Sequence, residues 1–362
     1  MWDMIARLGL LSLFIFSSLA ASIASAAEKP LNHLNHLNHL NHLNIVFLYG
    51  NRSHGSGAHE FRAGSMLLAK DLNRQKKIAI KATTFSNWPK DETVLDAADA
   101  IIFYNDATQI IDGNWEKVNA LAKAGKGIML MHYAVHPSEK NGEEFFKPWV
   151  GGYFKNGQSV NPFWSAKIKP LAGHPTSRGV DPVETIDEFY HSLEFCSDCK
   201  IHKIGVATPT KKNLLTINNL WTTSGQDSLG KEQLLLWGMD RPDGGRGAGF
   251  TGGHFHHNWA FNELRQLVLN TIVWVAGGEV PADGVDVNDL TEDELNANLD
   301  DYGDQTIRLA VPTKANRPEF TPNKYLTPKE RHDAKKATPE WNKFRGKIIG
   351  EQLIEAAPAL SK

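Results

Sequence analysis

Three histidines and one glutamate occupy places in this sequence where an α/β protein positions reactive side chains. Each follows an apolar or β-like segment closely or lies within one; His132, for example, comes directly after the run 127–131. Ligands of open α/β sheets bind beyond the carboxyl ends of the strands, so residues at these positions are expected to converge. We predict that four residues form one catalytic cluster: His59, His132, Glu188 and His254.

Two kinds of chemistry fit these side chains. Imidazole and carboxylate groups suit a divalent metal ion, above all zinc, and an open coordination position would polarise a carbonyl or hydroxyl group. Without a metal, a histidine could remove a proton next to a carbonyl, which permits isomerisation or elimination. Hydrolysis by paired carboxylates is less attractive, because the obvious acidic partner of Glu188 is Asp187. Neighbouring strand residues point to opposite faces, so these two are not expected to flank one bond.

Further polar and aromatic residues near the same segments could contact a substrate. Tyr190 and His191 alternate faces, so at most one of them can point to the same side as Glu188, and we choose Tyr190. For His256 and Trp259, the alternative to substrate contact is a structural role, packing in the turn or in the core. The predicted substrate-binding residues are Arg52, His54, Tyr133, His136, Tyr190, His256 and Trp259.

The elements that must position these residues alternate along the chain. Apolar runs predict parallel strands at 44–50, 78–85, 100–104 and 127–131. Apolar residues at helical spacing predict helices at 61–72, 112–123 and 259–276. Further strands are expected at 187–195, 201–208, 233–237 and 246–251. The pattern predicts an α/β fold: a mostly parallel, twisted sheet with helices on both faces, a β-rich insertion at about 150–250, and an irregular C-terminal extension.

Several phrases of the sequence resemble the ThuA-like (trehalose-utilisation) domain family over about residues 44–285. They are KGIMLMH (126–132), GHP (173–175), DEFY (187–190), GGRGAGFTGGH (244–254) and VWVAG (273–277). The resemblance implies a fold like that of class I glutamine amidotransferases, which is flavodoxin-like. It also implies a role in carbohydrate breakdown, with the family's functional positions falling on His59, His132, Glu188 and His254. Trehalose-pathway members commonly have glutamate after the late histidine, where this chain has Phe255 and then His256.

The positions of the two cysteines exclude one activity and predict a disulfide. Glutamine hydrolysis in the amidotransferase fold needs a thiolate at a sharp turn after a strand. The first cysteine is Cys196, so the turn after 127–131 cannot supply that thiolate, and the chain is not expected to be a glutaminase. Cys196 and Cys199 follow a β-like segment without the helix of a redox motif, so we expect a small structural disulfide.

The N-terminal segment has the pattern of an export signal. Residues 1–27 contain Arg7, an apolar core too short to span a bilayer, and an Ala-Ser-Ala site. A low-complexity Leu-Asn-His linker follows at 28–43, the predicted ThuA-like domain spans 44–281, and 282–362 form a peripheral extension. We therefore expect an exported, periplasmic or extracellular protein that is soluble and not membrane-bound after cleavage.

The net charge of −2 gives no electrostatic reason to bind nucleic acid, and we expect no nucleotide cofactor.

Our leading hypothesis is a carbohydrate enzyme with a small sugar substrate, acting as a lyase, hydratase or isomerase on an oxidised (3-keto) sugar or glycoside. One alternative is a non-catalytic carbohydrate-binding or sensing module of the same fold. Another is a periplasmic metal-binding protein that also uses the histidine repeat. The oligomeric state is not set by the sequence.

Overall fold

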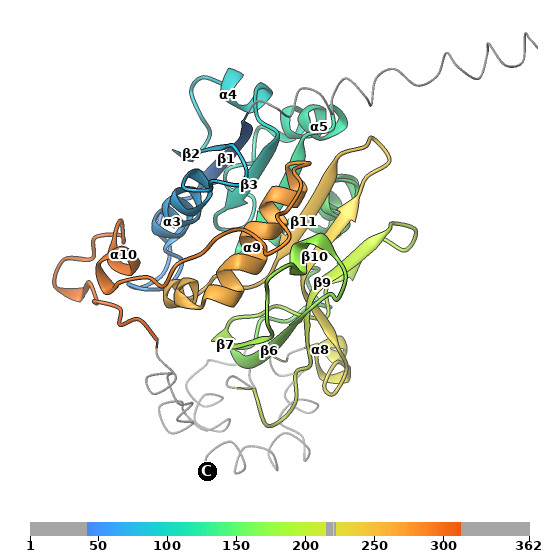
Figure 1. The fold of residues 1–362 in the computed structure, drawn as a ribbon. Helices are drawn as coiled ribbons and strands as arrows, with labels where there is room; N and C mark the ends of the chain where they lie inside the picture. Colours follow the sequence, from blue (N-terminus) through green and yellow to red (C-terminus); the bar gives the residue numbers. More distant parts are fainter. Residues whose placement is uncertain (1–41, 215–219, 221, 313–362) are drawn as a thin grey trace, which may run out of the picture. The chain divides into compact units, whose positions relative to one another are not determined.

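A nine-stranded mixed sheet forms the centre of the protein, in the order β2-β1-β3-β4-β11-β10-β9-β6-β7 (Figure 1). The computed structural model describes residues 42–214, 220 and 222–312. The predicted signal peptide, the linker up to residue 41 and residues 313–362 lie outside the described residues. The parallel half comprises β1 (Leu43–Tyr49), β2 (Ile80–Ser86), β3 (Ala100–Tyr104), β4 (Gly127–Met131) and β11 (Arg246–Phe250).

The β-rich insertion continues the same sheet with antiparallel strands. These are β6 (Trp164–Pro170), β7 (Val183–Asp187), β9 (Ile201–Ala207) and β10 (Gln233–Asp240). A two-stranded sheet pairs β5 (Gly152–Tyr153) with β8 (Glu194–Phe195). Four antiparallel pairings in succession give β7 the same direction as β11, so β7 ends at the same edge of the sheet as the parallel strands.

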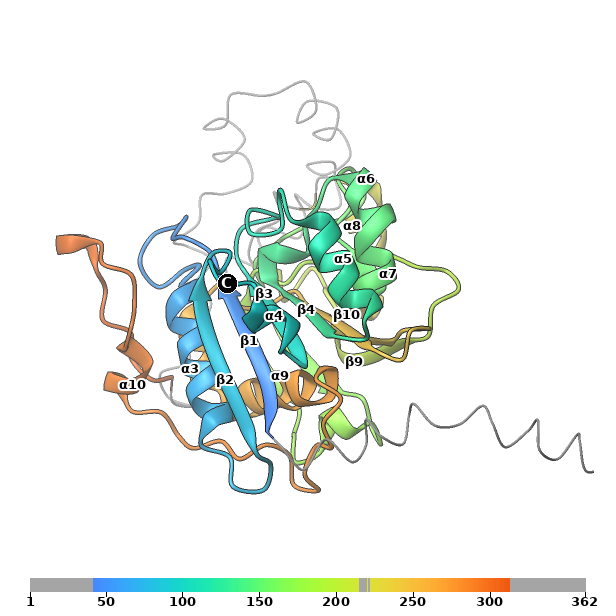
Figure 2. The ribbon, with the colours of Figure 1, turned by 90° about the horizontal axis from the view of Figure 1, so that it is seen from above.

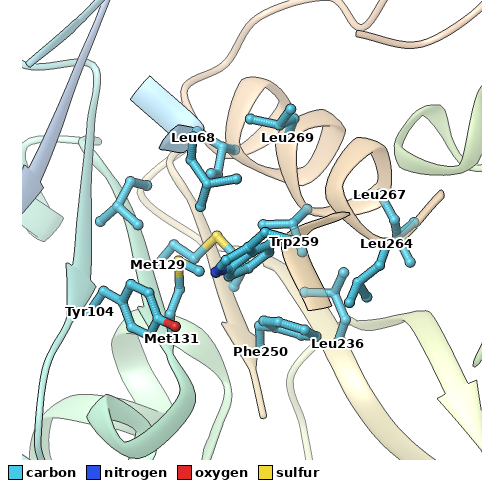
Figure 3. Close-up of a cluster of buried hydrophobic side chains, with 14 of the residues drawn as sticks. Leu68, Tyr104, Met129, Met131, Leu236, Phe250, Trp259, Leu264, Leu267 and Leu269 are labelled. Atoms are coloured by element: carbon cyan, nitrogen blue, oxygen red, sulfur yellow. The ribbon is translucent and has the colours of Figure 1, made fainter. Parts of the chain in front are cut away.

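Helices cover both faces of the parallel half because its strands are apolar on both sides. In β1, Ile45 and Phe47 join one core while Val46 and Leu48 join the other. The helices α3 (Phe61–Asn73) and α9 (Asn262–Val275) pack on the first core (Figure 3), and α5 (Trp115–Lys123) and α7 (Lys147–Val150) pack on the second. Figure 2 shows α3 and α5 on opposite sides of β1. The predicted α/β fold is confirmed.

The remaining elements are short. The helical ones are α4 (Thr93–Asp96), α6 (Glu139–Asn141), α8 (Thr223–Asp227) and α10 (Glu292–Asn296). There are 3₁₀ turns at His132–Val135, Pro175–Ser177, His256–Ala260 and Gly303–Gln305, and a π turn at Gly142–Phe146. Within the described residues, no helix is long and apolar enough to cross a membrane.

Several predicted elements end or begin elsewhere than expected. The strand predicted for 78–85 runs from Ile80 to Ser86, and the strand predicted for 233–237 continues to Asp240. The strand predicted for 187–195 stops at Asp187, and its remainder is irregular up to the short β8. The helix predicted from 112 begins at Trp115, with Asn114 at its N-cap. The helix predicted from 259 begins at Asn262, because the preceding residues form a 3₁₀ turn. The changes at Asp187 and at Asn262 adjoin the segments that carry Glu188 and His254.

A buried ion pair joins α3 to α9. Arg265 is 0% exposed, and its Nε lies 2.8 Å from Oδ2 of Asp71, whose side chain is 1% exposed. The same guanidinium donates to the carbonyls of Trp259 and Asn288. Arg265 thus connects both helices with the turn before α9 and with the C-terminal extension.

Replacing Arg265 with alanine is therefore expected to destabilise the fold strongly. Removing one partner of a buried pair leaves an uncompensated charge and costs about 3–5 kcal/mol. Urea unfolding measures the change. Arg74→Ala is the control, because Arg74 also contacts Asp71 but is partly exposed, and should cost about 1 kcal/mol or less. Equal midpoints for Arg265→Ala and the parent protein would contradict the prediction.

Candidate active site

The four residues of the predicted cluster come from four loops at one edge of the sheet. His132 follows β4 and His254 follows β11, which are neighbouring parallel strands. Glu188 follows β7, which ends at the same edge, and His59 precedes α3. All four side chains are buried. We call these residues, His59, His132, Glu188 and His254, the cluster.

The polar atoms of the cluster face one another. His59 Nε2 lies 3.0 Å from His132 Nε2 and 3.1 Å from His254 Nδ1. Glu188 Oε2 lies 3.1 Å from His254 Nδ1 and 3.6 Å from His132 Nε2. One ligand atom from each residue lies within 4.8 Å of the others, an arrangement that could hold a metal ion. The geometry thus brings the four sequence-predicted residues together.

Two of these histidines are held in an unusual backbone conformation. His59 and His132 each have a φ of 53°. Non-glycine residues in the left-handed region cost about 1–3 kcal/mol, and such strain concentrates at functional sites. The amide of His59 donates to the carbonyl of His254 at 2.9 Å, which joins two of the loops. At His132 the sharp turn after β4 presents an imidazole to the cluster.

Hydrogen bonds at the far side of the rings place a proton on Nδ1 of both His59 and His132. The Nδ1 of His59 lies 2.8 Å from Oδ1 of Asp106, and the Nδ1 of His132 lies 3.0 Å from the carbonyl oxygen of Thr251. Both partners are acceptors, so each Nδ1 carries the ring proton. When both rings are neutral, each has its one N–H at Nδ1, so two Nε2 lone pairs face each other. Two lone pairs cannot form a hydrogen bond, whereas both can bind one cation, so the donor set fits a metal ion.

Burial shifts the pKa values of three side chains in the cluster, those of His132, Glu188 and His254. It lowers the pKa of His254 to about 4 and that of His132 well below its usual value, so both rings are neutral at pH 7. Burial also raises the pKa of Glu188 to about 7, against the opposing effects of His59 and of a 2.8 Å hydrogen bond from Asn161. Neutral imidazoles are the form that binds metal ions.

Asp187 shapes the turn that carries His254. Its buried carboxylate accepts hydrogen bonds from the amides of Gly253 at 2.8 Å and His254 at 3.1 Å, and from the Asn258 side chain at 2.9 Å. Its oxygens are therefore engaged by backbone and side-chain groups of this turn. The sequence analysis gave it no such structural role, which depends on backbone contacts between β7 and the loop after β11.

Asp106 is a candidate site residue that the sequence analysis missed. It follows β3 directly after Asn105, so its position at the carboxyl end of a parallel strand was the available signal. Ser53, also missed, lies 3.0 Å from the Nδ1 atoms of both His54 and His59. Burial of the Asp106 carboxyl is outweighed by hydrogen bonds from His59 and Ser53, and its pKa is lowered.

Three of the predicted substrate-binding residues lie beside the cluster. The hydroxyl of Tyr190 lies 3.4 Å from His132 Nε2 and 3.5 Å from Glu188 Oε2. The ring of the exposed His54 lies against that of His59, with centroids 3.6 Å apart and planes tilted by 37°, and the half-buried Tyr133 ring is 6.3 Å from that of His59.

The half-buried His136 lies one step farther out, in ring contact with Tyr133 and bonded to Asn156. Arg52 is exposed but engaged by the C-terminal extension, where its guanidinium lies 4.7 Å from the Tyr302 ring centroid. These two residues therefore border the site without touching the cluster.

His256 and Trp259 do not fit the predicted substrate role. Trp259 is fully buried in the hydrophobic core with Tyr104 and Phe250 (Figure 3). His256 is buried too, and its Nε2 lies 2.9 Å from the carbonyl oxygen of Leu295 in α10. The 3₁₀ turn at His256–Ala260 directs both side chains into packing contacts, so their structural alternative holds.

Comparison with known proteins shows which family this chain is similar to. The ThuA family, described as "Trehalose utilisation", matches residues 46–275. The chain belongs to the ThuA family. A ThuA-like protein structure from Parabacteroides merdae is similar, with a TM-score of 0.47 and 14% identity, covering 67% of this chain and 92% of that one. Another, from Bacteroides uniformis, has a TM-score of 0.46 and 14% identity, covering 65% and 92%. No curated protein gives a significant match.

Membership of the ThuA family confirms the resemblance seen in the sequence. The match from 46 to 275 includes all four residues of the cluster and also Asp106. The described part of the extension, up to residue 312, lies beyond it.

Replacing Asp106 with asparagine is expected to weaken metal binding by the cluster about 10- to 100-fold, the usual effect of losing a charged partner behind a ligand histidine. The amide keeps the shape of the carboxylate but not the charge that holds His59 Nδ1–H. Competition with a chromophoric chelator measures the affinity. Asp99→Asn is the matched control, because Asp99 bonds the Asn44 amide instead. Unchanged affinity in Asp106→Asn would remove Asp106 from the site.

Proposed function

We propose that this ThuA-family chain is a carbohydrate-active enzyme with lyase, hydratase or isomerase chemistry on an oxidised (3-keto) sugar or glycoside. His59, His132 and His254 would hold a divalent metal ion, zinc by the chemistry of the donors, beside the Glu188 carboxylate. The observation that carries the proposal is the pair of Nε2 atoms of His59 and His132, which face each other at 3.0 Å.

A bound metal ion would supply a Lewis acid that polarises the substrate carbonyl. The chain's own groups account for the proton transfers. Glu188 Oε2 faces the cluster while Asn161 holds Oε1 at 2.8 Å, so the carboxylate is oriented to take a proton from the carbon next to a carbonyl. The Tyr190 hydroxyl, 3.5 Å from Glu188, is placed to bond a substrate oxygen.

In the lyase form of this reaction, Glu188 removes the C2 proton of a 3-keto glycoside. The C2–H electron pair forms the C1=C2 double bond as the C1–O bond breaks, and the leaving oxygen takes a proton. Addition of water to the same double bond would be the hydratase reaction. Atoms and charges balance in this step without an oxidant or a nucleotide.

The proposal includes export to the periplasm or outside the cell. Its basis is the signal-like sequence of residues 1–27, together with the Cys196–Cys199 disulfide found in the structure. Disulfides persist mainly in oxidising compartments.

The test combines elemental analysis with turnover of p-nitrophenyl 3-keto-β-glucoside, which releases p-nitrophenolate on elimination. A histidine-rich tract can bind metal weakly, so dialysis against a weak chelator precedes the analysis. About one zinc or similar ion per chain, and metal-dependent release of p-nitrophenolate, are expected. Sugar binding without turnover would instead indicate a binding module. Metal that disappears when the repeat histidines are replaced would indicate a metal-binding protein.

A further inference from the structure

Part of the C-terminal extension lies against the loop that carries His59. We call residues 294–309 the strap and residues 51–60 the site loop. The site loop bears Ser53, His54 and His59, whereas the strap lies beyond the region matched by the ThuA family. The two segments are more than 230 residues apart in sequence, so their contacts are purely tertiary.

Four polar contacts join the strap to the site loop. The Tyr302 hydroxyl donates to the carbonyl of His54 at 2.6 Å, and the Ile307 amide donates to Ser56 Oγ at 3.0 Å. Arg52 donates to the carbonyl of Asp301 while its guanidinium lies over the Tyr302 ring. The fourth contact passes through Glu60.

Glu60 is the central link between the two segments. Its side chain is buried, with Oε1 accepting from the Gly57 amide at 2.9 Å and Oε2 accepting from the Asp300 amide at 2.7 Å. One carboxylate therefore bonds both the site loop and the strap, immediately beside His59. Gly57 also packs closely, because a Cβ there would lie 3.1 Å from the side chains of Ile307 and Leu309.

The strap is itself anchored away from the site loop. Leu295 and Leu309 are buried in the hydrophobic core, and Asn296 bonds the backbone of Leu309 through both atoms of its amide. The carbonyl of Leu295 is bonded by His256, in the turn just after His254. The strap thus spans the two segments that carry His59 and His254.

We propose that the strap is a positioning device that holds the site loop closed over the cluster and slows release of its metal ion. Tyr302 and Glu60 are the positioning residues. The metal part of this inference rests on the proposed function. The physical reason is that His59 adopts a strained left-handed conformation, which persists only where surrounding contacts determine it. A loop that opens for part of the time holds its ligand more weakly, in proportion to the fraction closed.

The variants that test the strap leave the cluster residues untouched. Glu60→Gln places an amide donor against one of two backbone N–H groups, so one link breaks at nearly constant shape. Tyr302→Ala removes both the hydroxyl bond and the ring under Arg52, whereas Tyr302→Phe keeps the ring. Arg308→Ala is the matched control, because Arg308 pairs with Glu292 and Asp293 within the extension.

The first measurement is zinc release from the full-length protein to excess chelator, after dialysis has emptied the weak sites. Glu60→Gln and Tyr302→Ala are each expected to release zinc about tenfold faster than the parent, as loss of one or two hydrogen bonds implies. Tyr302→Phe should fall in between, and Arg308→Ala should match the parent. Equal release rates from a zinc-bound parent and both strap variants would overturn the proposal.

The second measurement is hydrogen exchange of residues 51–60 in metal-free protein, which is independent of the proposed metal site. Faster exchange is expected in Glu60→Gln and Tyr302→Ala and unchanged exchange in Arg308→Ala. If the parent binds no zinc, the proposed function loses its metal ion, but exchange still tests the strap. Unchanged exchange in both strap variants would overturn the strap even if zinc binds.

Discussion

A His254→Ala protein is expected to contain one metal ion fewer per chain than the parent and to lose at least about 10³-fold in turnover of the 3-keto glycoside. The physical reason is the position of His254 Nδ1, which lies 3.1 Å from both His59 Nε2 and Glu188 Oε2. Removing this donor leaves two imidazoles, too few for a tight site. Elemental analysis and p-nitrophenolate release measure the two effects on the same preparation.

The difference in metal content is informative even though the chain has 15 histidines, because the repeat contributes equally to both proteins. His174→Ala is the matched control. His174 bonds Thr176 and packs against His202, away from the cluster, so its loss should change neither metal content nor turnover. A His254→Ala protein that keeps both its metal and its turnover would remove His254 from the mechanism. The His254→Ala protein should still fold, because Asp187 holds the turn that carries residue 254 through its backbone amides.

Much of the fold was predictable because its parallel strands are short apolar segments whose ends are clear in the sequence. The strands 100–104 and 127–131 have the predicted limits, and the cluster follows from one rule about the carboxyl ends of parallel strands. The same rule points to Asp106, which the sequence analysis overlooked. The β-rich insertion was expected, but its place in the same sheet depends on pairings such as that of β6 with β9, which periodicity does not encode.

The sequence analysis failed for residues whose role depends on backbone atoms far away in the sequence. His256 looked like part of a histidine-rich site, yet it bonds the carbonyl of Leu295, 39 residues away. Asp187 organises the loop after β11 by accepting hydrogen bonds from backbone amides. Because almost every residue has a backbone amide, the sequence does not reveal which ones Asp187 contacts. The strap contacts are of the same kind, since Glu60 accepts from the backbone of Asp300. Side-chain types in the sequence predict a cluster of functional groups better than the backbone contacts that support it.

A Glu188→Gln protein is expected to keep its metal ion and to lose turnover by about 10²–10⁴-fold, the usual contribution of a positioned acid–base group. The three histidines are untouched, and the glutamine oxygen can still accept from Asn161, so the shape of the site is retained. What disappears is the oxygen that can take a proton. Elemental analysis together with the p-nitrophenolate assay separates the two roles of this residue.

Glu184→Gln is the matched control for this experiment, because Glu184 lies on β7 near Glu188 but is exposed and bonds Ser165. It should behave as the parent does. Loss of the metal ion in Glu188→Gln would make the carboxylate a fourth ligand, and normal turnover would remove it from proton transfer. His254→Ala and Glu188→Gln together distinguish the groups that hold the ion from the group that moves the proton. That division is the one we propose: the three imidazoles hold the ion, and Asn161 orients the Glu188 carboxylate for proton transfer.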